Sequence, residues 1–147
     1  MAVGTITGVL TRIPVKMGRP SIAVLKLTCT ASSTVASYPA TVINPLAVTA
    51  DSRTFDIRGL KLYSVKCYPG DTAPTDATDL TITDEYGVDL LGGKGTDVID
   101  STSKTWTLVG PSGSYSPALI TGDLTVTISN NAVNSAVTTL ILELVGD

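Results

Sequence analysis

The chain has 147 residues, the length of one ordinary domain, and a single core of that size buries roughly two thirds of the unfolded surface. It contains no histidine, which removes the commonest general base and metal ligand and argues against an enzyme. The net charge is only −3, and no apolar run is long enough for a membrane helix. We expect no cofactor, no bound metal, and neither nucleic acid nor membrane as a partner.

The first residues carry the first basic cluster of the chain. Arg12, Lys16 and Arg19 precede every acid, and two prolines lie among them. The preceding run, residues 3–10, is uncharged and rich in β-formers, and proline interrupts strand pairing. Residues 1–20 therefore form either an extended arm that adds a strand to a neighbour, with Arg12, Lys16 and Arg19 as partner contacts, or the first strand of the protein's own sheet.

Alternating or branched apolar runs then recur along the whole chain, bounded by Gly, Pro, Asn and Asp. The sequence has 23 threonines and only 5% aromatic residues, a composition that suits pleated, half-exposed strands with an aliphatic core. These features predict one all-β domain over residues 1–147, a β-sandwich or jelly roll of about eight antiparallel strands. The predicted strands cover residues 3–13, 21–29, 40–50, 55–68, 79–84, 104–109, 123–130 and 136–145.

Two kinds of residue in these runs are candidates for chemistry. Cys29 and Cys67 have no spacing typical of zinc or thiol redox sites, and we expect buried free thiols in preference to a disulfide. Trp106, the only tryptophan, is in phase with Leu108, and we expect it in the core in preference to an exposed carbohydrate platform.

Residues 79–91 combine four acids with a strand pattern. The alternation predicts a strand, a turn at residues 84–87 and a returning arm, with Asp84 capping the turn and Asp79 and Asp89 as solvated charges. The positions of the acids do not match a calcium-binding loop. As a catalytic pair of carboxylates, Asp84 and Asp89 would have to work without histidine, so we expect a structural role for these acids in preference to a catalytic one. The glycine-rich segment 90–97 also lacks the spacing of a phosphate-binding loop, so we interpret it as a turn.

Charge is divided unequally along the chain. Residues 1–70 carry eight basic groups and two acids, whereas residues 71–147 carry two basic groups and eleven acids. Such a division is typical either of docking between surfaces of opposite sign or of ordinary solvated faces.

The pattern of residues 59–145 resembles small β-sandwich virion proteins of tailed bacteriophages. The shared features are a strand ending in a Pro-Gly turn, a Pro-Thr-Asp stretch, an acid-and-glycine hairpin, a Gly-Gly loop and a last hairpin through Asn130 and Asn131. The resemblance implies a capsid decoration or cement protein, or a part of a head or tail fibre. It transfers no functional residues, because the shared positions are turn and core positions, and it does not cover residues 1–58.

Two functions follow as expectations. The first is a cement protein that is made in the host cytoplasm, binds the major capsid protein on the virion surface and forms a dimer or trimer. The alternative is a receptor- or glycan-binding module of a fibre or baseplate that uses Tyr86, Tyr115 and the loop 110–117.

Overall fold

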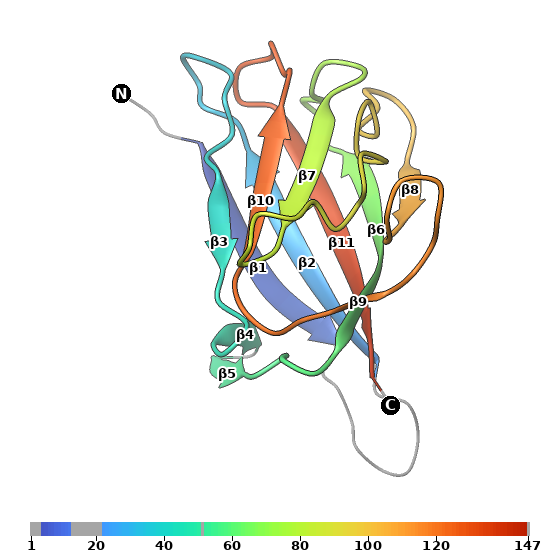
Figure 1. The fold of residues 1–147 in the computed structure, drawn as a ribbon. Coiled ribbons are helices and arrows are strands. Elements are labelled where there is room, and N and C mark those ends of the chain that lie inside the picture. The colour runs from blue at the N-terminus through green and yellow to red at the C-terminus, as the bar shows by residue number, and fades with distance from the viewer. Residues whose placement is uncertain (1–3, 13–21, 51, 147) are drawn as a thin grey trace.

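The computed structural model describes residues 4–12, 22–50 and 52–146, and every regular element in these ranges is a β-strand. Two antiparallel sheets pack face to face as a β-sandwich, and a short two-stranded ribbon lies at one end (Figure 1). Among the residues in these ranges there is no helix long and apolar enough to span a membrane. The predicted all-β class and sandwich architecture are confirmed, whereas the more specific jelly-roll topology stays a prediction.

The larger sheet contains both the first and the last strand of the described chain. Its strand order is β1-β2-β11-β6-β8, with the short β9 also paired to β6, and every neighbouring pair is antiparallel. The strands are β1 (Thr5–Arg12), β2 (Ile22–Thr30), β11 (Val137–Val145), β6 (Lys61–Pro69), β8 (Thr105–Leu108) and β9 (Ala118–Leu119).

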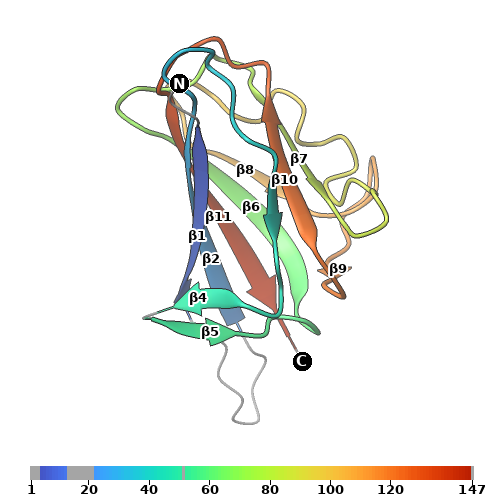
Figure 2. The same cartoon turned by 90° about the vertical axis from the view of Figure 1, so that its left-hand side faces the viewer.

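The smaller sheet has the order β3-β10-β7 and covers one face of the larger sheet (Figure 2). It consists of β3 (Thr41–Ile43), β10 (Leu124–Ser129) and β7 (Asp79–Thr83). The ribbon pairs β4 (Val48–Ala50) with β5 (Arg53–Phe55) and closes the lower end of the sandwich in Figure 2. No described element covers the other face of the larger sheet.

The core follows directly from the alternation along the strands, because successive side chains of a strand point to opposite faces. Along β11 every second residue is buried, and β2, β10 and β7 show the same pattern. Each fully buried Leu or Ile contributes about 1.5–3 kcal/mol of transfer free energy. Core residues of this kind include Leu25, Leu27, Leu80, Ile82, Leu124, Leu140 and Leu142.

Most predicted strands lie where the sequence pattern places them, but four segments differ. The predicted strand 40–50 divides into β3 and β4 at a turn that is closed by a hydrogen bond from the Ala47 amide to the Asn44 carbonyl. The predicted strand 55–68 is shorter, because residues 56–60 are not in a strand and β6 begins only at Lys61. Two very short strands, β5 and β9, have no clear pattern in the sequence and raise the number of strands to eleven in the described ranges.

Candidate binding surface

The acids of residues 79–91 organise turns. Asp84 Oδ1 accepts hydrogen bonds from the backbone amides of Tyr86 and Val88, both at 2.9 Å, so the predicted turn cap is confirmed. After the turn the chain pairs back only through a bridge between Thr83 and Asp89, and the predicted returning arm is therefore shorter than a strand. The carboxylates are held by amide hydrogens, as expected for structural caps.

Asp79 and Asp89 are not simply solvated, and that part of the prediction is wrong. Asp89 accepts hydrogen bonds from the amides of Leu91, at 3.1 Å, and Gly93, at 2.9 Å. Asp79 accepts one from the Asp97 amide at 2.7 Å and one from the Asn130 side chain. Short loops leave several amides without strand partners, and these carboxylates satisfy them. Within the described ranges there is no group of three or more Cys, Asp or Glu that could hold a metal ion.

The glycine-rich segment 90–97 is a series of turns, as predicted, and it lies against β7. A Cβ on Gly95 would lie 1.9 Å from the carbonyl oxygen of Leu80, so only glycine allows the backbones to approach this closely. The Leu80 amide donates a 2.9 Å hydrogen bond to the Gly95 carbonyl. The lysine of this segment, Lys94, donates to backbone carbonyl oxygens of the loop 110–114 and is not placed to bind phosphate as in a nucleotide-binding loop.

The two cysteines are buried free thiols, as expected from the sequence. Burial, with a smaller contribution from Cys67, raises the pKa of Cys29 to about 12. Burial also raises the pKa of Cys67 to about 11, against a smaller opposing effect of a hydrogen bond with Thr105. A nucleophilic cysteine requires a thiolate, and these two are neutral at physiological pH.

The uncovered face of the larger sheet, which we call the outer face, is the most extended candidate for binding. Strand register aligns one row of side chains across all five strands. The row consists of Val9, Lys26, Ile141, Lys66 and Trp106. Its ends are exposed hydrophobic residues, since Val9 is 40% and Trp106 is 58% exposed. A second row contains Thr7, Thr28, Thr139 and Tyr68.

Trp106 corrects the expectation of a core anchor. In β8 it pairs with Lys66 and lies on the outer face, whereas Thr105 and Thr107 pair with the buried residues Cys67 and Val65. Trp106 and Leu108 do lie on the same face of β8, as their spacing predicts, but the pattern does not show which face of a short edge strand is buried. Thr105 satisfies its hydroxyl by donating to the carbonyl of Val98, which makes a threonine acceptable on the inner side.

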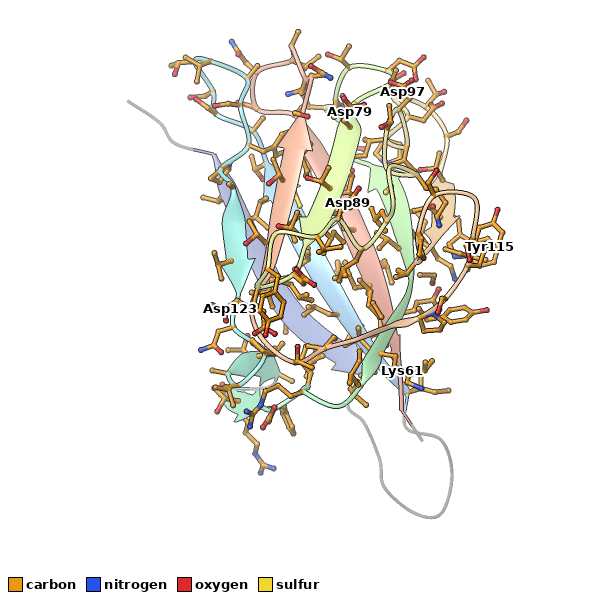
Figure 3. All side chains as sticks on the ribbon, in the orientation of Figure 1. Lys61, Asp79, Asp89, Asp97, Tyr115 and Asp123 are labelled. Carbon is orange, nitrogen blue, oxygen red and sulfur yellow. The ribbon has the colours of Figure 1, made fainter. Side chains whose placement is uncertain are left out.

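The charge division of the sequence becomes a division between the two layers. The described strands of the larger sheet carry four basic residues, Arg12, Lys26, Lys61 and Lys66, and a single acid, Glu143, whose carboxylate lies 3.1 Å from Lys66. Lys61 is the first residue of β6, in the larger sheet (Figure 3). Acidic residues dominate on the side of the smaller sheet. Figure 3 shows Asp79, Asp89, Asp97 and Asp123 on that acidic side. The two sides thus present opposite charge to any partner.

The predicted partner-contact residues belong to the start of the chain. Residues 5–10 and Arg12 pair with β2, with one register shift at Thr11, and they complete the protein's own sheet, which is the second of the two alternatives for this segment. Arg12 ends β1 in register with Val24. Lys16 and Arg19, like both prolines, lie outside the described residues, and their proposed contacts stay predictions.

Neither a scan against protein-family models nor a search of curated proteins finds a match for this chain. Its function is therefore inferred from the outer face, the charge distribution and the residue pattern of 59–145.

Proposed function

We propose that the protein is a structural, non-enzymatic virion protein that binds the capsid surface as a decoration or cement protein. It docks through the outer face and stabilises contacts between major capsid subunits. The observation that carries this proposal is that the larger, six-stranded sheet has one face without any described cover and with exposed Val9, Ile22, Tyr63 and Trp106. The virion context comes from the resemblance over residues 59–145.

The size of the outer face supports a protein partner. Four strands of eight or nine residues and the four-residue β8, about 4.8 Å apart and with about 3.3 Å per residue, give an area of roughly 20 by 30 Å, or at most about 600 Å². A specific interface buries about 800 Å² on each partner, so this face supplies most of what is needed. The paired strands also hold it rigid, which lowers the entropy lost on binding.

The chemistry of the face also suits docking. Aliphatic side chains such as Val9 and Ile141 alternate with Lys26 and Lys66 along the central row, and Trp106 lies at its end. Protein interfaces are enriched in aromatic residues relative to the rest of the protein surface. The basic outer face would be directed to an acidic capsid surface while the acidic side faces solvent, and this charge would act mainly on association rate. We expect the bound protein to be a dimer or trimer, following the symmetry of closed assemblies.

Purified capsids of the parent phage test this proposal. Ile141→Asp places an acid between Lys26 and Lys66, so the fold should tolerate it while the apolar centre of the face is lost. We expect at least tenfold weaker capsid binding for this variant. The matched control is Thr81→Asp on the outer surface of the smaller sheet, which should bind as the wild type does.

Electron microscopy of virions supplies the second test. A cement protein requires density in hundreds of copies on the shell, whereas a fibre protein is present in far fewer. Density confined to the tail, or full capsid binding by a folded Ile141→Asp variant, would contradict the proposal.

A further inference from the structure

A hollow lies beside the outer face, where β8 forms the edge of the larger sheet. It has a volume of about 440 Å³ and is lined by Lys94, Trp106, Thr107, Leu108 and Tyr115. Trp106 is 58% and Tyr115 is 69% exposed, so two large rings border the same open space. Figure 3 shows Tyr115 projecting from the loop beside β8. We call this hollow the aromatic cleft.

The loop that carries Tyr115 is fixed. Lys94 Nζ donates to the carbonyl oxygens of Gly110, at 2.9 Å, and Pro111, at 3.1 Å, and it also donates to Ser114. The same ammonium nitrogen lies 5.0 Å from the centre of the Tyr115 ring, within the range of a cation–π contact. The ring is therefore held in place before any ligand binds, which lowers the entropic cost of binding.

The loop backbone is held as well. The Ser116 amide donates a 2.8 Å hydrogen bond to the Val109 carbonyl, and the Ser114 amide donates one of 2.9 Å to Pro111. Gly110 has φ 142°, and a Cβ at this position would lie 2.5 Å from the Ser116 nitrogen. A glycine is required here to bring the loop back against β8.

We propose that the aromatic cleft is a binding site for a neutral saccharide, with a pyranose ring stacked on Trp106 and Tyr115. A pyranose has an apolar C–H face and a rim of hydroxyls, and it suits the amphipathic rings of Trp and Tyr. The volume lies within the range of about 300–1,000 Å³ that is typical of small-ligand sites. The hydroxyl of Tyr115, which is an exposed residue of the same lining, supplies a polar group for a sugar hydroxyl.

The lysines around the aromatic cleft favour a neutral ligand over an anionic one. Lys94 directs its three donors to three backbone carbonyls. Lys66, 5.9 Å from the Trp106 ring centre, is paired with Glu143 at 3.1 Å. Single-stranded nucleic acid also stacks on aromatic rings, but it requires a strongly basic groove. The whole chain has a net charge of −3, so the cleft fits a saccharide better than a nucleic acid.

Trp106 is the only tryptophan in the sequence, so its fluorescence reports on the aromatic cleft alone. The full-length protein would be titrated with neutral oligosaccharides of glucose, mannose, galactose and N-acetylglucosamine, and the same sugars would be screened on an array. We expect at least one of them to change the tryptophan emission in a saturable manner.

Variants then locate the site. Tyr115→Ala should weaken binding at least tenfold, and it should fold normally because this side chain is exposed. Val35→Ala is the control, since Val35 is a 63% exposed hydrophobic residue on the loop between β2 and β3 and does not line the cleft, so this variant should bind as the wild type does. No response to any of these oligosaccharides, equal binding by Tyr115→Ala, or a response only to single-stranded oligothymidine would overturn the proposal. Capsid docking is tested separately by Ile141→Asp.

Discussion

Ser64 on β6 donates a 2.7 Å hydrogen bond to the carboxylate of Glu143 on β11, directly across the two central strands. Lys66 Nζ lies 3.1 Å from the same carboxylate oxygen. Glu143 is the only acid on the described strands of the larger sheet, and it lies next to a register shift at which Tyr63 has no register partner in β11. A completely buried serine hydroxyl is thus satisfied at the point where the ladder is irregular.

This arrangement predicts an acid-dependent contribution to stability. Partial burial raises the pKa of Glu143, but the hydrogen bonds from Ser64 and Lys66 and the charge of Lys66 outweigh it, so the net pKa lies below the ordinary 4.5. A carboxyl with a lowered pKa stabilises the fold above its unfolded pKa, and this contribution is lost as the pH falls through the lowered value. Glu143→Gln keeps an acceptor but no charge, so its free energy of unfolding should vary less with pH below 4.5. Urea denaturation at neutral and acid pH, with Asp71→Asn as control, measures this. An unchanged pH dependence in Glu143→Gln would contradict it.

Lys94 should hold the loop 110–116 in place. Lys94→Met removes the donors to Gly110, Pro111 and Ser114, and we expect a loss of about 1–2 kcal/mol in the free energy of unfolding. The amides of Ser114 and Ser116 should also exchange faster with solvent, which hydrogen-exchange mass spectrometry measures. Lys104→Met is the control, because Lys104 contacts Tyr68 elsewhere on the edge. Equal exchange in both variants would show that the loop is held by its backbone alone.

The turn after β7 tests whether Asp84 acts as a structural hydrogen-bond acceptor. Asp84→Ala removes the acceptor for two backbone amides and should cost about 1 kcal/mol, whereas Asp84→Asn keeps a carbonyl oxygen and should cost less. Thermal unfolding of both variants compares these costs. If the two variants were equally destabilised, the carboxylate charge would matter more than its role as an acceptor.

The buried thiols predict slow labelling and a loss of stability at high pH. The pKa of Cys29 is raised to about 12 and that of Cys67 to about 11, chiefly by burial, so both groups are neutral in the folded protein at pH 8. The unfolded chain loses these protons near pH 9, so stability is complete below that pH and falls as the pH rises toward 11 and 12. Thiol labelling with and without urea should give two modified cysteines only in urea. Rapid labelling of the native protein would disprove the burial.

The sandwich could be predicted because buried and exposed residues alternate strictly in strands that have a neighbouring strand on each side, such as β11 between β2 and β6. In β11 the residues Leu140, Leu142 and Leu144 alternate strictly with half-exposed ones, and the structure buries all three. A one-residue shift would expose the whole set, so the pattern determines the face.

The sequence was less informative at the edges of the sheets. In β8 either phase of Thr105–Leu108 is acceptable locally, and only pairing with Cys67 and Val65 shows that the threonines face inward. The sequence indicates Trp106 and Tyr115 separately as candidate sugar-binding residues, but it could not bring them together, because their meeting in the aromatic cleft depends on the fold. Lys94 was the one charged residue near this site that the sequence singled out. Its local sequence does not show that it donates hydrogen bonds to carbonyl oxygens of the loop 110–114.

The first strand provides the last prediction. β1 completes the larger sheet, and its Leu10 is only 4% exposed while Ile6 packs on the core from the same side of the strand. Deleting residues 1–20 should therefore lower the melting temperature strongly and leave the β2 edge open to association with other chains. Leu10→Ala should cost about 2–5 kcal/mol because a buried leucine leaves a cavity. Val9→Thr is the matched control on the outer face, 40% exposed, and should change stability by less than about 0.5 kcal/mol. Thermal and urea unfolding, with light scattering for association, measure these effects. A truncated protein that keeps the wild-type melting temperature would show that β1 is dispensable, and the segment would then be free to act as an arm toward the capsid.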